Sequence, residues 1–187
     1  MKIPPFTLDR QYQEISSEIE GEVFKVLKEG QFIKGQQVTI FEEKFSNLIG
    51  VEHTIGCNSG TDALVLALRA LDIGAGDEVI TSSFSFFATA EAISLVGANP
   101  ILVDIDPETY LINTELIERE INSNTKAIMP VHLFGNSVNM NLIKSLANKY
   151  DLKVIEDCAQ ATCTMWETSK VGSIGDIGCF SFFPPRI

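Results

Sequence analysis

The sequence lacks the excess of basic residues that marks proteins bound to nucleic acid or to anionic membranes. Its 187 residues include 14 lysines and arginines against 25 aspartates and glutamates, which gives a formal net charge of −11. Non-specific binding to phosphate backbones and to anionic lipid depends mostly on Lys and Arg, so an acidic chain binds both poorly. We therefore expect no nucleic acid and no membrane among the partners.

Long apolar runs are also missing. No stretch approaches the roughly 20 uninterrupted apolar residues that a membrane-spanning helix needs, and even the segment 84–96 is interrupted by Glu91. The first five residues place Pro4 and Pro5 where the apolar region of a signal peptide would begin. These features predict a cytoplasmic protein.

Cysteine is scarce and unpaired. The four cysteines form no CxxC pair, and neither histidine lies at metal-ligand spacing from them. Each cysteine lies in or beside an apolar run, which favours buried thiols in a reducing compartment over a metal site. We therefore expect no metal; the cysteines are Cys57, Cys158, Cys163 and Cys179.

What is present is the composition of a packed domain, 45% hydrophobic and 21% charged. Apolar residues at helical spacing predict two helices in the first fifty residues, ending at Gly30 and Gly50. From residue 52 short β-rich runs alternate with helical ones, which predicts an α/β fold with a mostly parallel sheet and helices on both faces. The expected strands are 53–57, 78–82, 100–105, 126–132, 152–158 and 177–183, and the expected helices are 61–71, 87–96, 114–121 and 141–150.

Ligands of open α/β sheets bind beyond the carboxyl ends of the strands, so the segments there are candidate sites. After the first expected strand, Ser59, Gly60 and Thr61 precede a helix, whose free N–H groups and dipole favour a phosphate. An ordinary helix cap without a ligand is the alternative. After the second strand comes Ser-Ser-Phe-Ser-Phe-Phe, residues 82–87, in which one ring could stack on a planar cofactor or all three could be core residues.

Two further segments carry polar groups at strand ends. Asp157 closes an apolar strand beside Glu156, and Gln160 follows on the turn. A buried carboxylate needs a cationic or hydrogen-bonding partner, which a protonated ring nitrogen or a neighbouring helix end would supply. Ser181 is a lone hydroxyl in an aromatic run and is available to a phosphate oxygen. Neither a GxGxxG nor a GxxxxGK[ST] loop is present, which argues against nucleotide binding of those two kinds.

In their order along the chain, these segments resemble the DegT/DnrJ/EryC1/StrS sugar aminotransferases, pyridoxal-phosphate (PLP) enzymes of the aspartate-aminotransferase fold, fold type I. The resemblance implies that residues 1–187 are an incomplete large domain, with a helical segment at 1–50 and an α/β core at 51–187, and that the C-terminal small domain is absent. The matching segments are GQFIKG at 30–35, NSGTDAL at 58–64, VDIDP at 103–107, VHLFG at 131–135, EDCAQA at 156–161 and GSIGD at 172–176.

The resemblance also implies roles for particular residues. Gly60 and Thr61 would bind the cofactor phosphate with help from Ser181, and Phe86 would stack on the cofactor ring. Asp157 would pair with the pyridinium nitrogen and so keep the ring an electron sink. Gln160 would lie near the hydroxyl group of the cofactor ring.

The family's Schiff-base lysine stands five residues after the serine that matches Ser181, a position held here by Arg186. A guanidinium stays protonated and offers no neutral amine, so it cannot replace that lysine. We therefore expect a truncated, inactive fragment of an enzyme that transfers an amino group from glutamate to a nucleotide-linked keto sugar in amino-sugar or polysaccharide biosynthesis. The resemblance implies a homodimer at full length. Two alternatives remain: a relative of the pyridoxamine-phosphate-dependent sugar dehydratases, and a non-catalytic remnant that keeps dimer contacts.

Overall fold

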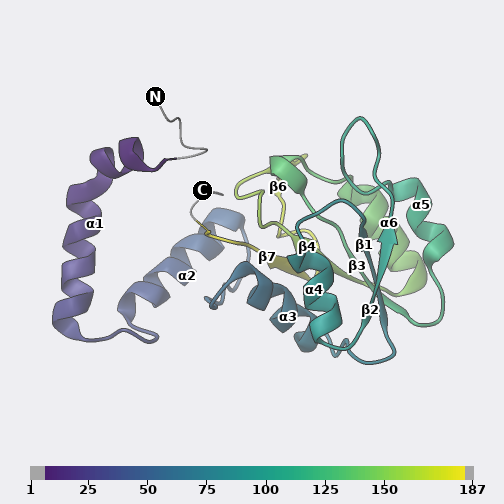
Figure 1. Ribbon diagram of the computed structural model, residues 1–187, viewed down its shortest axis with the longest axis horizontal. Helices are drawn as coiled ribbons and strands as arrows, with labels where there is room; N and C mark the ends of the chain where they lie inside the picture. Colours follow the sequence, from purple (N-terminus) through teal and green to yellow (C-terminus); the bar gives the residue numbers. More distant parts are fainter. Residues whose placement is uncertain (1–6, 184–187) are drawn as a thin grey trace. The chain divides into compact units, whose positions relative to one another are not determined.

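The computed structural model describes residues 7–183, which divide into two compact units (Figure 1). The first unit comprises residues 7–47 and 52–56. It contains α1 (Asp9–Glu29) and most of α2 (Gln36–Ile49). Both helices agree with the sequence prediction, and α1 ends at Gly30 in the left-handed conformation, with φ 69°. Gly50, which follows α2, also has a positive φ, 89°.

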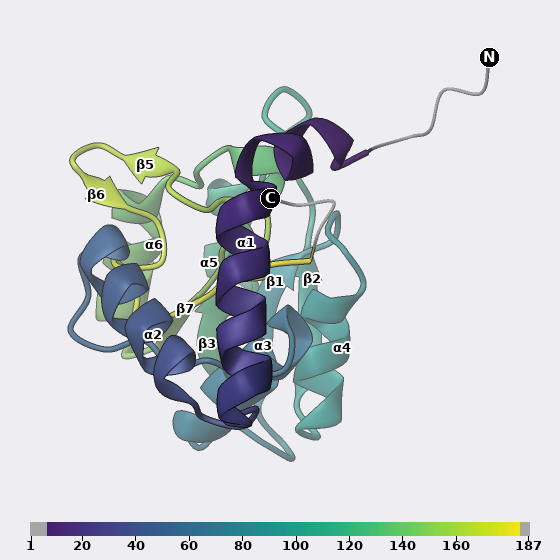
Figure 2. The ribbon, with the colours of Figure 1, turned by 90° about the vertical axis from the view of Figure 1, so that its left-hand side faces the viewer.

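The second unit, residues 48–51 and 57–183 of the described chain, is built on a five-stranded parallel sheet. The strand order is β2-β1-β3-β4-β7. Along the chain, β1 is followed by β2 at one edge of the sheet, and then by β3, β4 and, at the other edge, β7. Figure 2 shows the short antiparallel pair β5 and β6 outside this sheet. The strands are β1 (Glu78–Ser82), β2 (Asn99–Val103), β3 (Thr125–Met129), β4 (Lys153–Asp157), β5 (Met165–Trp166), β6 (Ser169–Lys170) and β7 (Ile177–Cys179).

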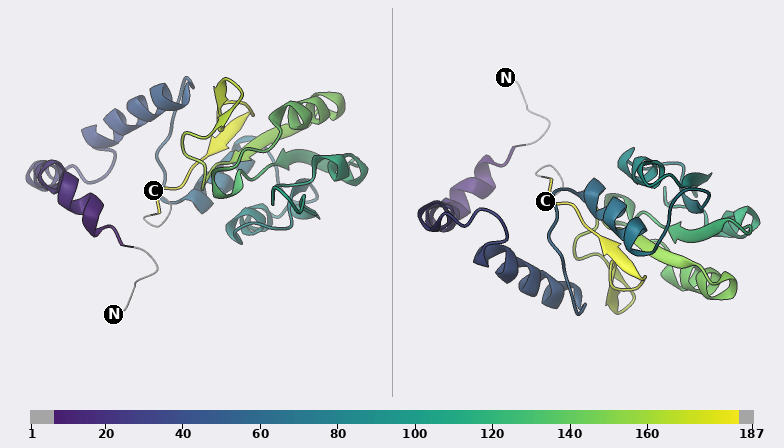
Figure 3. Two further views of the ribbon diagram at one scale, coloured as in Figure 1. Left: turned by 90° about the horizontal axis from the view of Figure 1, so that it is seen from above. Right: turned by 90° about the horizontal axis from the view of Figure 1, so that it is seen from below.

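Helices cover both faces of the sheet. The helices α3 and α4 pack against each other on one face, and α5 and α6 pack against each other on the opposite face. Figure 3 shows β7, in yellow, beside β4 at the edge of the sheet. The α/β class with a mostly parallel sheet is therefore confirmed. The helices are α3 (Gly60–Ala70), α4 (Ala88–Leu95), α5 (Thr114–Glu120) and α6 (Met140–Tyr150), with a 3-10 turn, η1 (Leu133–Gly135).

Alternation along the strands produces two separate apolar layers. In β4, Val154 packs with the α5 and α6 side, whereas Ile155 packs with the α3 and α4 side. Because successive side chains of a strand point to opposite faces, the next two residues alternate in the same way. Glu156 therefore lies on the α5 and α6 face, and Asp157 lies on the α3 and α4 face.

Two expectations about strands were wrong or incomplete, and one pair of strands was not predicted. Residues 53–57 form no strand; the N–H of Gly56 instead donates to the Glu42 side chain at 2.7 Å. The strand expected at 177–183 ends at Cys179, and the aromatic run beyond it lies at the mouth of a cavity. The pair β5 and β6 was not predicted, because two-residue strands carry too little alternation to be recognised.

Candidate functional site

A cavity of about 260 Å³ opens at the carboxyl ends of the strands, on the α3 and α4 side of the sheet. All six residues that the sequence singled out line this cavity. They come from segments up to 121 positions apart, counting from residue 60 to residue 181. The fold thus brings together Gly60, Thr61, Phe86, Asp157, Gln160 and Ser181.

The first wall of the cavity is the N-terminus of α3. Ser59 is extended and caps the helix, because its hydroxyl accepts the N–H of Asp62 at 3.1 Å. Within the described residues the N–H groups of Gly60 and Thr61 have no hydrogen-bond partner. A side chain at position 60 would put its Cβ 2.8 Å from the Cβ of Ser181, so only glycine fits there. Two free N–H groups and one hydroxyl therefore face the same small space, an arrangement suited to an anion.

Asp157 forms the floor of the cavity at the end of β4, and it is only 4% exposed. One carboxylate oxygen, Oδ2, accepts the hydroxyl of Thr89 at 2.9 Å. The other, Oδ1, accepts the backbone N–H of Ala159 at 3.1 Å. These donors come from α4 and from the turn after β4, so two separate elements fix the carboxylate.

Gln160 is oriented by an unusual turn. Phe134 has a left-handed backbone, with φ 54°, and its N–H donates to Oε1 of Gln160 at 3.0 Å. A bulky residue with positive φ is rare, and such strain concentrates at functional sites. With Oε1 engaged, the amide nitrogen of Gln160 has no partner within the described part of the chain and is able to donate to a ligand.

The aromatic segment after β1 lies at the surface rather than in the core. Phe84, Phe86 and Phe87 are 46%, 57% and 72% exposed. The alternative of three core aromatics is therefore wrong for this segment. Phe86 lines the cavity, while Phe84 packs against Tyr110 with 6.0 Å between ring centroids.

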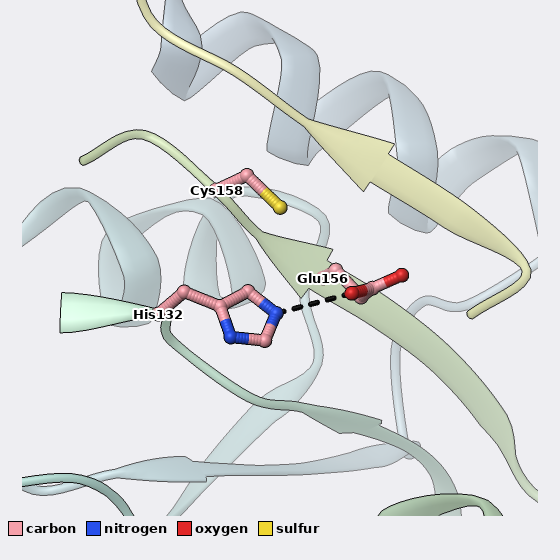
Figure 4. Close-up of side chains that lie close together, drawn as sticks. All are labelled: His132, Glu156 and Cys158. Carbon is pink, nitrogen blue, oxygen red and sulfur yellow. Dashed lines mark hydrogen bonds and ion pairs between the residues drawn. The ribbon is translucent and has the colours of Figure 1, made fainter. Parts of the chain in front are cut away.

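Behind Asp157, on the opposite face of β4, lies a fully buried pair formed by His132 and Glu156 (Figure 4). His132 Nε2 lies 3.1 Å from Oε2 of Glu156, and Nδ1 accepts the N–H of Val138 at 3.1 Å. Since Nδ1 accepts, the ring proton is on Nε2, which donates to the carboxylate.

The carboxylate of Glu156 also collects the loop that leads into β7. Its two oxygens accept the N–H groups of Gly172, Ile174 and Gly175 at 2.8, 2.8 and 2.6 Å. Burial alone would raise the pKa of Glu156, but the hydrogen bonds from His132, Gly172 and Gly175 outweigh it and lower that pKa below its ordinary value. The loop precedes Ser181, so Glu156 anchors one wall of the cavity from the far side of the sheet.

The side chains of His132, Glu156 and Cys158 come within 4.8 Å of one another and include atoms that bind metals (Figure 4). Both nitrogens of His132 and both oxygens of Glu156 are already engaged in hydrogen bonds with the protein. Burial, and then the charges of Glu156 and Asp157, raise the pKa of the Cys158 thiol well above its usual range. A buried neutral thiol is a weak metal ligand, and the cluster is accounted for as a hydrogen-bonded anchor.

Burial of all four thiols was expected, and the structure corrects this for two of them. Cys158 and Cys179 are buried, whereas Cys57 and Cys163 are exposed. Cys57 lies in the irregular segment before α3 and Cys163 lies in a turn after β4, where an adjacent apolar residue does not imply burial. Among the described residues, no helix combines the length and the apolarity needed to cross a membrane.

Sequence reasoning missed Thr89 and the anchoring role of His132 and Glu156. Thr89 stands within an apolar helical run, where a threonine gives no sign of the strand it will face. The one available signal was the Glu156-Asp157 pair, since adjacent strand residues point to opposite faces. That alternation implies one carboxylate in the cavity and one needing partners in the core.

The parallel sheet ends in a cavity lined by a helix N-terminus and a buried carboxylate, and comparison with known proteins identifies the class of the protein. The sequence of residues 13–187 matches the DegT/DnrJ/EryC1/StrS aminotransferase family. A UDP-N-acetyl-3-dehydro-alpha-D-glucosamine 3-aminotransferase from Acidithiobacillus ferrooxidans is 50% identical over 184 residues, which cover 98% of this chain and 50% of that protein. The chain therefore belongs to this aminotransferase family.

Solved structures support the same assignment. DesV of S. venezuelae, in complex with a ketimine intermediate, matches with a TM-score of 0.96 at 34% identity, over 99% of this chain and 50% of that one. NtdA of Bacillus subtilis, with bound cofactor PMP, matches with a TM-score of 0.88 at 38% identity, over 95% of this chain and 40% of that one. The fold is that of fold type I PLP enzymes. The chain spans about half the length of the relatives it matches.

Proposed function

We propose that this chain is the cofactor-binding part of a PLP-dependent aminotransferase that moves an amino group from glutamate to a nucleotide-linked keto sugar. The observation that carries the proposal is the convergence of the six predicted residues on one cavity. Relatives named as nucleotide-sugar aminotransferases support the substrate class and a place in amino-sugar or polysaccharide biosynthesis. A cytoplasmic location, a homodimer and the division at residue 50 remain predictions of the sequence.

The residues present fit the phosphate of such a cofactor. The N–H groups of Gly60 and Thr61 are available at a helix N-terminus, where the dipole favours negative charge. The Ser181 hydroxyl lies close to this helix end, since a Cβ on Gly60 would lie 3.2 Å from its Oγ. We propose that these three groups bind the phosphate and that the missing side chain at position 60 lets Ser181 approach the backbone at the helix end.

The floor and sides of the cavity fit the ring. We propose that Asp157 holds a proton on the pyridine nitrogen and that the free amide of Gln160 donates to the ring hydroxyl. Phe86 would cover one ring face as a stacking partner. Bound PLP supplies the electron sink on which transamination depends, and the protein's contribution here is to keep its ring nitrogen protonated and its plane fixed.

Arg186 lies outside the described residues, and the resemblance places it at the position of the family's lysine. Because a guanidinium remains protonated, it neither attaches the cofactor nor moves a proton from it. We therefore propose that this chain binds the cofactor reversibly. Arg186 also favours a second candidate function, a non-catalytic relative that binds cofactor without turnover.

The test uses the 187-residue chain with pyridoxamine phosphate (PMP), which binds without a covalent bond, and with PLP. Equilibrium dialysis should show saturable PMP binding by the wild type. Borohydride treatment of the PLP-loaded chain, followed by mass spectrometry, should leave the wild-type mass unchanged. Arg186→Lys should add one reduced cofactor per chain, and Arg186→Gln is the matched control that adds none.

The outcomes separate the two candidates. A lysine at position 186 that becomes labelled supports an active site built for an aminotransferase. PMP binding without labelling of Arg186→Lys favours the non-catalytic relative. Failure of the wild type to bind PMP at all would contradict both.

A further inference from the structure

Thr89 occupies a place that no recognised motif assigns, directly between the aromatic segment and the cavity floor. It is the second residue of α4 and is only 2% exposed. Its hydroxyl lies 2.9 Å from Oδ2 of Asp157 and 2.8 Å from the hydroxyl of Ser85. It also lies 3.2 Å from the carbonyl oxygen of Phe86. Three polar groups thus converge on one hydroxyl.

The single hydroxyl proton decides how this group is used. An ionised carboxylate only accepts, and it attracts a donor more strongly than a neutral carbonyl does. The Thr89 proton is therefore given to Asp157, which is also the nearer of the two acceptors. Ser85 must then donate to Thr89, because the Thr89 oxygen has no second proton. The order of donation is Ser85 to Thr89 to Asp157.

A structural role confined to α4 would leave the proton elsewhere. Threonine in the first turn of a helix commonly bonds to a backbone carbonyl three or four residues earlier, as the Phe86 oxygen would allow. Here the shorter contact crosses from α4 to β4, between residues 68 positions apart. The second donor to Asp157, the Ala159 N–H, reaches the other oxygen. Thr89 and Ala159 together fix the rotation of the carboxylate about its last bond.

We infer that Thr89, supported by Ser85, is a positioning residue that aims the Asp157 carboxylate at the cofactor's ring nitrogen. The inference rests on the proposed function, in which Asp157 holds the proton of that nitrogen. Loss of the Thr89 hydroxyl would remove the hydrogen bond that α4 donates to Oδ2, and the carboxylate would turn away from the ring. The ring proton would then be held less firmly, although Thr89 itself never touches the cofactor.

The test compares Thr89→Val with Thr89→Ser in the full 187-residue chain. Valine keeps the shape and removes the hydroxyl, whereas serine keeps the hydroxyl. With PMP as probe, Thr89→Val should bind about tenfold more weakly, the loss expected from about 1.4 kcal/mol. Thr89→Ser should bind within about threefold of the wild type, or about 0.7 kcal/mol.

The decisive readout is the pH at which bound PMP loses its ring proton, followed by its near-ultraviolet absorbance. A residue that merely packs α4 would not shift this pH. Thr89→Val should lower it, and Thr89→Ser should retain the wild-type value. Urea unfolding of both variants without PMP shows whether either has lost its fold.

The outcomes distinguish this inference from the proposed function. If Thr89→Val binds PMP as tightly as the wild type and bound PMP loses its ring proton at the same pH, the positioning role is overturned and the proposed function stands. If Thr89→Val unfolds, the test uses the pH at which PMP bound to Thr89→Ser loses its ring proton. A value that differs from that of the wild type would overturn the positioning role, and an unchanged value supports it. Absence of PMP binding by the wild type overturns both proposals together.

Discussion

Two carboxylates that are neighbours in the sequence have opposite surroundings. Glu156 is fully buried, and its oxygens accept one hydrogen bond from His132 and three from backbone N–H groups. Asp157 faces a cavity and is held by one hydroxyl and one backbone N–H. The difference follows from the alternation of side chains along β4. One strand thus presents one carboxylate to the core and the next to the cavity.

The different surroundings give the two carboxylates different tasks at the end of β4. The loop that Glu156 anchors runs from Gly172 to Gly175 and enters β7, which leads to Ser181. It approaches so closely that a Cβ on Gly175 would lie 2.7 Å from the Val154 carbonyl oxygen. Glu156, the rear carboxylate, therefore sets the position of a cavity wall, while Asp157, the front carboxylate, faces the cavity.

The largest expected effect is on stability. Glu156→Gln replaces an acceptor oxygen by an NH₂ group that must face N–H donors, so the network loses at least one bond and gains a repulsive contact. We expect the free energy of unfolding to fall by about 3 kcal/mol, as for other broken buried charge networks. Urea denaturation followed by circular dichroism measures this loss.

The control for that experiment is Asp157→Asn, which should cost only about 1 kcal/mol because the side chain has fewer donors to satisfy. Equal losses for the two variants would abolish the distinction between the rear and front carboxylates. A loss below that of Asp157→Asn would show that the Glu156 network contributes no stability beyond its packing.

The second effect is on PMP affinity, and here the substitution of Asp157 should have the larger effect. Asp157→Asn removes the negative charge proposed to face the ring nitrogen, and PMP affinity should fall by about 2 kcal/mol, or roughly thirtyfold. Equilibrium dialysis without urea, under conditions in which the variant is folded, measures the affinity for PMP. Undiminished binding by Asp157→Asn would show that the front carboxylate does not contact the cofactor.

Much of this arrangement was predictable from the sequence, and the limits have physical causes. The alternation of apolar and helical runs predicted the parallel sheet, and the six cavity residues followed from the resemblance. For Phe86, Asp157 and Gln160 the position at or just after a predicted strand end pointed the same way. Thr89 was not predictable, because its contact with Asp157 depends on how α4 packs over β4, not on any local pattern. The prediction of a strand at 53–57 was wrong because residues with high β-propensity form a strand only where a neighbouring strand pairs with them.

The third effect concerns the opposite wall. Gly60→Ala would bring a methyl group to 2.8 Å from the Ser181 Cβ, and this crowding should destabilise the chain by about 1.5 kcal/mol. It should also weaken PMP binding, because the crowding displaces Ser181, one of the three groups proposed to bind the phosphate. Thermal unfolding and dialysis report the two losses. The matched control is Gly74→Ala, whose Cβ would lie 3.6 Å from its nearest neighbour, the Val96 carbonyl oxygen; a control as damaging as Gly60→Ala would refute the steric argument.

The smallest effect is a pH dependence carried by the rear carboxylate, where burial opposes the hydrogen bonds. These bonds hold the pKa of Glu156 below its ordinary value of 4.5 in the folded state. The folded state therefore binds this proton less readily than the unfolded state. The resulting stability is fully present above the unfolded pKa and is lost as the pH falls through the folded one. The difference in unfolding free energy between the wild type and Glu156→Gln should thus narrow on acidification.

Urea unfolding at a series of pH values, from neutral to below the ordinary carboxyl pKa, measures this narrowing. Glu120→Gln is the matched control, because Glu120 is exposed at the end of α5 and removing its charge leaves the buried network intact. A Glu120→Gln gap that narrows as much as the Glu156→Gln gap would show that the narrowing does not come from the buried network. A gap between the wild type and Glu156→Gln that stays constant across the series would mean that the folded and unfolded states bind the Glu156 proton equally. The four donors would then compensate burial without favouring the charge, and the two carboxylates would differ only in which face of the sheet they occupy.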